Sequence, residues 1–374
     1  MPISLDDLRR FAVARSLFPP TTLKRAVEKM GFVQADPIRA PARAQDLTLR
    51  HRVKGYHAGD LERLYERLGI EEDFFVTYGF VTRELHALMH PRSERGVPAG
   101  GCAPISAAHR KQQEQILAFV REHGAVHPRE VDDHFSHGTV TNYWGGSSNA
   151  TTHMLDAMHY RGLLRVARRD RGIRVYTAHD PHGAEPADAA ERHSRFDALV
   201  DVVVSLYAPL PGRSLSNFVR RLRYAVPQWH GELTAALQRA KARLAHARVD
   251  GVDWYWPPDE DPARHATEET VRLLAPFDPI VRDRDRFELF WGWVYRFEAY
   301  TPVKKRKRGY YAQPLLWRDR VIGWGELSVN DGELQSNIGF IKSPPRDRAF
   351  KRELEADLDR VRMFLRLEAA SIQA

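Results

Sequence analysis

The region 105–178 constrains the fold more tightly than any other part of this sequence. Apolar residues recur at helical spacing in 105–124, 126–135 and 147–164. A glycine ends the first of these segments, and serine and asparagine residues that can cap a helix begin the third. Two strand-like runs then surround the basic turn RDRG at 169–172. Three helices followed by a basic hairpin predict a winged helix.

The same order of elements is visible, less clearly, on both sides of this region. Helical patterns at 4–17 and 21–30 lead into a short apolar strand, and a helix at 58–68 and a strand at 73–81 are predicted after it. Beyond residue 190, three helical patterns again lead into one strand. We therefore predict four domains: a winged helix at 1–105, a winged helix with a basic wing at 106–190, a winged-helix-like domain at 191–268, and a β-rich domain at 269–374.

The last predicted domain has a different sequence pattern. Apolar and polar residues alternate in 286–302, 309–317 and 320–329, which predicts strands of an antiparallel sheet. The sequence WRDRV at 317–321 predicts a tight turn, and an amphipathic helix at 347–370 closes the chain. The predicted fold class is therefore α+β: tandem winged helix-turn-helix domains, then an antiparallel β-rich region and a terminal helix.

The charge of the chain predicts a polyanionic partner. Its net charge is +8 and its pI is near 9.6, and the excess comes mainly from arginine, whose planar guanidinium matches phosphate. Five consecutive cations at 304–308 lie between predicted strands that contain tyrosines, which predicts a hairpin tip that clamps phosphates. A solvated basic surface is the alternative. The predicted DNA-binding residues are Arg39, Arg43, Arg169, Arg171, Arg174, Lys304, Lys305, Arg306, Lys307 and Arg308.

Two polar side chains stand on the short strand within GFVQADPIRAPARAQ at 31–45. Asp36 could cap a helix that begins at the next proline, but Pro41 would disrupt the first turns of that helix, so we expect it to begin near Pro41. Asp36 is then extended, and Gln34 and Asp36 share one face of the chain. They form a candidate site, although a buried pair can also merely satisfy the backbone of a loop.

Several other classes of function find no support in the sequence. His134 with His137, and His51 with His57, lack the third and fourth ligands that zinc sites require. The sequence contains no phosphate-binding loop, dinucleotide motif or serine-hydrolase motif. We therefore predict that the protein uses no metal and no cofactor.

Cysteine usage and hydropathy predict the compartment. Cys102 is the single cysteine, so no internal disulfide can form. No run approaches the roughly 18 apolar residues of a membrane span, and the N-terminus is an amphipathic helix rather than a signal peptide. These features predict a cytoplasmic protein that does not bind membranes.

Two stretches resemble the winged-helix DNA glycosylases of the AlkZ/YcaQ type. VQADPIRAPARAQ is similar to the Gln-Φ-Asp motif of that family, and the second stretch is LLAPFDPIVRDRDRFELFWGWVYRFEAYTPVKKRKRGYYAQPLLWRDRVIGWGEL near the C-terminus. Three departures stand out: Ala35 replaces a larger aliphatic residue, Arg39 and Gln45 replace the Asn and His typical of crosslink-repair members, and FFVTYGFV replaces a stretch with His-Glu.

This resemblance implies a C-shaped molecule of tandem winged helices that excises bulky N7-alkylguanines from double-stranded DNA, including interstrand crosslinks. It also implies that Gln34 and Asp36 are catalytic and that basic hairpins grip the DNA. We expect a monofunctional, monomeric, nucleoid-associated enzyme. A non-enzymatic winged-helix regulator or architectural protein is the alternative, and it would lack lesion-dependent chemistry.

Overall fold

The computed structural model describes residues 2–92, 107–135, 139–141, 147–179 and 186–367. The chain has a mixed α/β fold with two compact units. The first unit comprises Met1–Arg63, Asp201–Asn217 and Ala240–Ala374, and the second comprises Leu64–Val200 and Phe218–Arg239. Cys102 and His137 lie outside the described residues. Within the described ranges, no helix has both the length and the hydropathy needed to cross a membrane.

The first unit begins with the predicted helices and strand. Helix α1 (Leu5–Ser16) starts at a capping box formed by Ser4 and Asp7. Helix α2 (Leu23–Met30) is capped by Thr22 and ends at Gly31, whose φ of 67° suits glycine. Strand β1 (Phe32–Gln34) follows, and after an irregular loop come helices α3 (Ala44–Leu49) and α4 (Asp60–Arg63).

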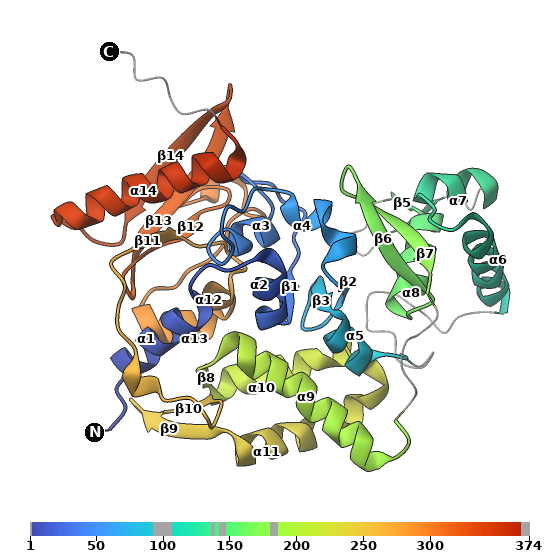
Figure 1. Cartoon of the computed structure of the whole chain (residues 1–374), viewed down its shortest axis with the longest axis horizontal. Helices are drawn as coiled ribbons and strands as arrows, with labels where there is room; N and C mark the ends of the chain where they lie inside the picture. The colour runs from blue at the N-terminus through green and yellow to red at the C-terminus, as the bar shows by residue number, and fades with distance from the viewer. Residues whose placement is uncertain (1, 93–106, 136–138, 142–146, 180–185, 368–374) are drawn as a thin grey trace. The chain divides into compact units, whose positions relative to one another are not determined.

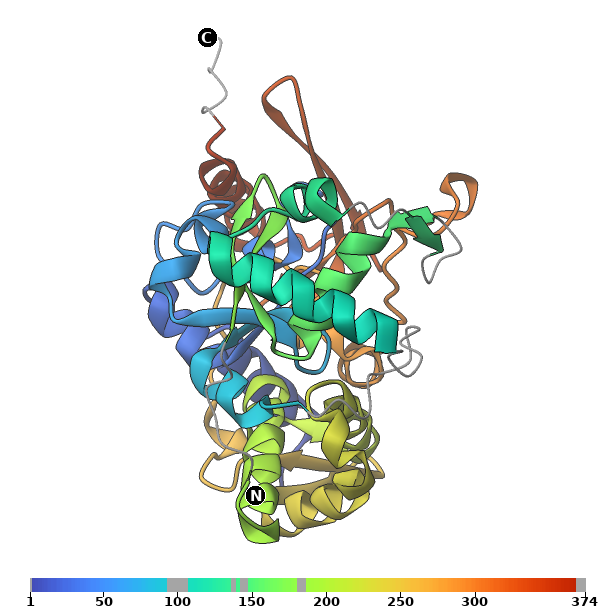
Figure 2. The same ribbon diagram turned by 90° about the vertical axis from the view of Figure 1, so that its right-hand side faces the viewer.

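A four-stranded antiparallel sheet dominates the C-terminal part of the first unit. Its order is β11 (Val271–Leu273), β12 (Gln313–Trp317), β13 (Arg320–Asn330) and β14 (Glu333–Phe340). Helix α14 (Arg348–Leu365) lies across one face of the sheet (Figure 1) and packs Phe350 and Val361 into its core. In Figure 2, β13 and β14 form the long hairpin whose turn lies near the top of the view. The tight turn predicted after Trp317 is confirmed.

Two predictions for this part of the chain are wrong. The stretch 286–302 does not form a strand, because α12 (Pro279–Arg282) and α13 (Arg284–Trp291) lead into it and α13 occupies its first part. Asp283 caps α13 and left-handed Gly292 ends it, and these signals outweigh the apparent alternation. The basic run is not a hairpin tip either. It begins with a short 3-10 turn, Val303–Lys305, in an irregular segment between α13 and β12.

The first unit also contains a small sheet in the order β8-β10-β9. The stretch predicted as one strand is a hairpin, β9 (Ala245–Val249) and β10 (Val252–Trp256), because Asp250 and Gly251 adopt the positive φ angles of a tight turn. Strand β8 (Leu210–Pro211) pairs with β10. Three helices each belong partly to the first unit and partly to the second: α9 (Ala189–Tyr207), α10 (Gly212–Arg221) and α11 (Leu233–Arg243).

The second unit contains the elements predicted at 105–178. Helices α6 (Ala107–His123), α7 (Pro128–Phe135) and α8 (Ala150–Tyr160) precede the hairpin β6 (Leu164–Asp170) and β7 (Ile173–Ala178). A short strand pair, β4 (Thr139–Thr141) and β5 (Ser147–Asn149), lies between α7 and α8. The three helices and the hairpin share one apolar core, which includes Ile116, Val131, Leu155 and Tyr176.

The start of the second unit differs from the prediction. The expected helix at 58–68 is split into α4 and a 3-10 turn, Tyr65–Arg67, and the expected strand at 73–81 is a hairpin of β2 (Ile70–Phe74) and β3 (Tyr78–Thr82). Helix α5 (Arg83–Met89), which Thr82 caps, was not predicted. The division into four domains stays a prediction.

Candidate active site

The loop between β1 and α3 presents the candidate residues. Phe32 and Val33 are buried and anchor the strand, which ends at Gln34. The loop then runs to Arg43, the N-cap of α3, so the helix begins three residues later than Pro41. Asp36 therefore lies in irregular backbone beyond the strand, which agrees with the bias that a following proline imposes.

Asp36 is a half-buried carboxylate without a cationic partner among the described residues. Its Oδ1 accepts a hydrogen bond from the backbone N–H of Ile38 at 2.9 Å, and its own N–H donates to Oε1 of Gln45 at 3.4 Å. Burial raises the pKa of Asp36, and the bond from Ile38 offsets only part of that rise. The carboxylate is thus fixed through one oxygen while its negative charge lacks compensation.

Gln34 is held by a different part of the chain. Its Oε1 accepts a hydrogen bond at 2.8 Å from Nε of Arg282, at the end of α12. No hydrogen bond joins the described side chains of Gln34 and Asp36, because the strand alternation stops at Gln34. The contact with Arg282 brings together the two stretches that carried the sequence resemblance.

A polar pocket of about 700 Å³ opens next to this loop. Arg39 and Pro41 contribute one side, Tyr310 and Tyr311 contribute another, and polar residues of β13 and β14 complete it, among them Glu326, Ser328, Gln335 and Asn337. Tyr311 is almost fully buried, and its hydroxyl has no hydrogen-bond partner in the described part of the chain. Burial raises the pKa of Tyr311, and the nearby charge of Asp36 raises it further. The pocket therefore adjoins the candidate carboxylate.

The predicted DNA-binding arginines have unequal surroundings. Arg39 is exposed at the pocket, whereas Arg43 forms an ion pair with Glu62. On the wing, Arg171 is exposed at the turn, but Arg169 pairs with the buried Glu72 at 2.5 Å and Arg174 pairs with Asp156 at 2.7 Å. Three of the five arginines outside the basic run thus serve internal ion pairs, and contact of any of them with DNA stays a prediction.

The basic run is held in a defined conformation. Oε2 of Glu298 accepts hydrogen bonds from the backbone N–H groups of Lys307 and Arg308 at 2.9 and 2.8 Å. The guanidinium of Arg306 lies 5.0 Å from the ring centre of Tyr310, and that of Arg308 lies 4.9 Å from Trp293. The side chains of Lys304, Lys305 and Lys307 are exposed. The run therefore offers three accessible ammonium groups on a braced loop.

Comparison with known proteins assigns the chain to a family. Residues 27–364 match the family described as DNA glycosylase AlkZ-like. The chain belongs to the AlkZ-like DNA glycosylase family. The match includes Gln34, Asp36 and the residues that contact them. The chain is also similar in structure to the Streptomyces sahachiroi DNA glycosylase AlkZ, with a TM-score of 0.62 and 13% sequence identity over 97% of both chains. At this identity, the likeness shows a shared fold.

Sequence reasoning assigned no role to three residues that lie around the candidate site. Gln45 supports the Asp36 backbone, Arg282 holds Gln34, and Tyr311 lines the pocket. All three lie within the two stretches quoted for the resemblance. A search of those stretches for charged or hydroxyl side chains could have singled out Arg282 and Tyr311, but only the fold shows which partner each one meets.

Proposed function

We propose that this family member is a monofunctional DNA repair glycosylase that hydrolyses the N-glycosidic bond of bulky, cationic N7-alkylguanines. The observation that best supports this role is the half-buried, uncompensated carboxylate of Asp36 beside an open polar pocket. Carboxylates that pair with cations are common in folded proteins. A carboxylate whose ionised form is disfavoured by burial and is not stabilised by a cation is a candidate catalytic group.

The chemistry of the substrate makes a small active site sufficient. An N7-alkylated guanine is already cationic and leaves as a neutral base, so the enzyme need not supply a general acid. An oxocarbenium-like sugar and an attacking water remain, as in glycoside hydrolysis. A charge pair about 4 Å apart at an effective dielectric of about 20 interacts by about 4 kcal/mol, which is roughly a thousandfold in rate. One carboxylate can therefore accelerate cleavage of a labile bond.

We assign separate tasks to the two candidate residues. Asp36 stabilises the sugar cation and orients or deprotonates the water, with Oδ1 fixed by Ile38 and Oδ2 directed to the reacting atoms. Gln34 positions the water or the deoxyribose through its amide, whose oxygen Arg282 holds in place. The pocket beside Tyr311 is within the size range of small-molecule sites and would receive the alkylated base.

The same proposal includes the mode of DNA binding. The three helices and hairpin of the second unit would act as a winged helix, with similar modules before and after it in the chain. Exposed cations, including Arg39, Arg171 and Lys304, would contact the phosphate backbone without reading sequence. The substrate would be double-stranded DNA of the nucleoid, bound by one copy of the chain.

Abasic-site formation tests this function. The full-length protein is incubated in single turnover with duplexes that contain a bulky N7-alkylguanine, an interstrand crosslink between N7-alkylguanines, or only undamaged bases. We expect abasic sites in the alkylated duplex and none in the undamaged one, and the crosslinked duplex shows whether unhooking occurs. Tight binding without excision from either lesion would instead identify a non-enzymatic DNA-binding protein.

A further inference from the structure

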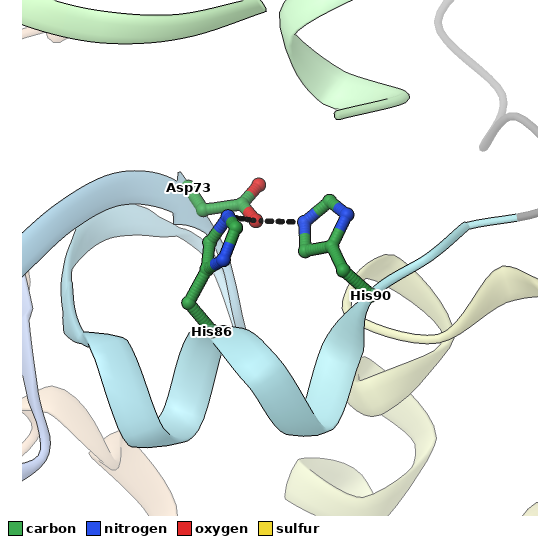
Figure 3. A group of neighbouring side chains, drawn as sticks. All are labelled: Asp73, His86 and His90. Carbon is green, nitrogen blue, oxygen red and sulfur yellow. Dashed lines mark hydrogen bonds and ion pairs between the residues drawn. The ribbon is translucent and has the colours of Figure 1, made fainter. Parts of the chain in front are cut away.

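Three side chains that can ligate metals converge in the second unit (Figure 3). Asp73 lies near the end of β2, His86 lies on α5, and His90 ends that helix one turn later. Nε2 of His90 lies 2.8 Å from Oδ2 of Asp73, and Nε2 of His86 lies 3.6 Å from the same oxygen. All three ligand atoms lie within 4.8 Å of one another, and all three residues are buried.

The carboxylate is oriented from its other side. Arg92 donates a hydrogen bond from Nη1 to Oδ1 of Asp73 at 2.8 Å. The same guanidinium is anchored to the backbone carbonyl oxygens of Phe74, Tyr160 and Ala225. Oδ2 is thereby directed toward the histidines. Such outer hydrogen bonds are typical supports of carboxylates that ligate metals.

Both histidines present the same ring atom to the carboxylate. Each ring is buried and approaches Oδ2 of Asp73 with Nε2, a nitrogen that can ligate a metal. Their rings stack at a centroid distance of 4.2 Å, which turns both toward the same oxygen. Nε2 of His90, the atom that would ligate the ion, makes the hydrogen bond of this ring, whereas Nδ1 is buried and has no hydrogen-bond partner among the described residues.

The spacing fits a small divalent ion. Ligands of a tetrahedral zinc ion with bonds of about 2.0 to 2.1 Å lie roughly 3.3 Å apart. The separation of 3.6 Å between His86 and Asp73 is close to that value, whereas His90 would retreat by about half an ångström from its hydrogen bond. Two histidines four residues apart in the chain, one on α5 and one at its C-cap, together with one carboxylate also match the residue types of a common zinc ligand set.

We propose that Asp73, His86 and His90 form a binding site for a divalent transition-metal ion of the zinc type, which ties β2 to α5. The three side chains fill three of the four positions of a tetrahedral ion, and the chemistry assigned to Asp36 does not use the ion. Because Arg92 already neutralises the carboxylate, two neutral imidazoles and a paired aspartate hold the ion more weakly than thiolate-rich sites do.

Metal titration of the full-length chain tests this proposal. The protein is stripped with a chelator, checked for folding by circular dichroism, and titrated with Co²⁺ and then Zn²⁺. We expect one equivalent of Co²⁺ to develop visible ligand-field bands, zinc to displace it, and zinc to raise the melting temperature. His86→Ala should lose all three effects, because it removes one of three ligands. His123→Ala, which alters an exposed histidine of α6, is the matched control and should retain them.

The outcomes separate a metal site from a hydrogen-bonded cluster. If the stripped wild-type protein takes up no stoichiometric ion, or if His86→Ala binds as well as the wild type, the proposal is wrong. His90→Ala removes a hydrogen bond as well as a ligand and can unfold the chain, so His86→Ala and the melting temperature decide the result. Metal uptake is measured without DNA, so failure of the metal proposal and failure of the proposed glycosylase activity can be told apart.

Discussion

Asp36 and Asp73 are both withdrawn from water, but their surroundings differ. Asp36 lies in a loop of the first unit, accepts one backbone hydrogen bond and pairs with no cation in the described structure. Asp73 lies on a strand of the second unit, where Arg92 and His90 both donate to it. Burial alone would raise both pKa values. At Asp36 the effect of burial is the larger one, so the pKa is raised. At Asp73 the hydrogen bonds and charges of Arg92 and His90 outweigh burial and hold the pKa well below its ordinary value.

The neighbours of Asp73 extend this contrast. Glu71 bonds to Arg83 and Arg165, and Glu72 bonds to Arg169 and to the hydroxyl of Tyr78. The acidic residues of strand β2 thus form ion pairs and hydrogen bonds with neighbouring side chains of the second unit. Cations compensate the charges of these carboxylates, whereas no cation in the described structure compensates that of Asp36. The comparison teaches that pairing, rather than burial, separates a carboxylate that the fold stabilises from one that is left for the chemistry proposed above.

The largest expected effect is loss of excision in Asp36→Asn. The substitution keeps the shape of the side chain and removes its charge, so single-turnover excision of N7-alkylguanine should fall by about two to four orders of magnitude. Duplex affinity, measured by fluorescence anisotropy, should stay constant or rise slightly because an anion leaves the site. A folded variant that excises at the wild-type rate would reduce Asp36 to a residue that caps the loop.

The matched change in the second unit, Asp73→Asn, should act on stability instead. It leaves the buried Arg92 without its counter-ion, and breaking such a pair costs roughly 3–5 kcal/mol. Urea denaturation at neutral pH measures the free energy of unfolding of this variant beside that of Asp36→Asn. Equal stabilities of the two variants would contradict the contrast between a structural and a reactive carboxylate.

Gln34→Ala should reduce excision less than Asp36→Asn does. The amide positions a reacting group through hydrogen bonds and stabilises no full charge, so a loss of about 1 kcal/mol, or roughly five- to tenfold in rate, is expected. Single-turnover rates of the two variants on the same duplex give the ranking. A loss as large as that of Asp36→Asn would assign the main chemical task to Gln34.

Replacement of all five residues of the basic run, Lys304 to Arg308, with serine should weaken binding to duplexes of any sequence. The plot of log affinity against log salt should become shallower by up to about 0.9 for each phosphate that the variant no longer neutralises. The exposed lysines should account for most of this change, because Arg306 and Arg308 stack on aromatic rings. The double variant Lys304→Ser with Lys305→Ser separates the contribution of the lysines from that of the arginines. An unchanged slope would show that the basic run is a solvated surface that does not contact phosphates.

The pH dependence should show the smallest effect. Asp36 must be ionised to act, and its pKa is raised, so excision should decline as the pH falls toward a midpoint above the ordinary value of 3.8. Asp73 has a lowered pKa, so its contribution to stability is complete above its unfolded-state pKa and is lost only as the pH falls through the folded-state value. Activity should therefore decline before this part of the second unit loses stability, and circular dichroism at each pH checks the order.

The sequence predicts the fold best where local signals agree. In 105–178, helical spacing, a terminal glycine and a turn all favour the same elements, and the structure contains them. In 286–302, the apparent alternation favours a strand, but Asp283 and Gly292 set the ends of a helix. A short stretch fits both periodicities, and only its caps and packing decide between them.

The candidate site follows the same rule. Pro37 and Pro41 indicate that Asp36 lies in extended or irregular backbone, and the structure places it there. The partner of Gln34 could not be predicted in this way, since Arg282 is 248 positions away. The histidine cluster was missed because α5 was not predicted, although the spacing of His86 and His90 is visible in the sequence.

The first unit also has a consequence for protein synthesis. The loop that follows β1 contacts Arg282 through Gln34 and lies near Tyr311, and Arg52 pairs with Asp278. The ribosome synthesises these partners long after the loop itself. Both segments of the second unit, Leu64–Val200 and Phe218–Arg239, are synthesised before Asp278, Arg282 and Tyr311. During translation the second unit can therefore fold before the loop around Asp36 meets its partners. The site around Asp36 can be completed only when almost the whole chain has been made.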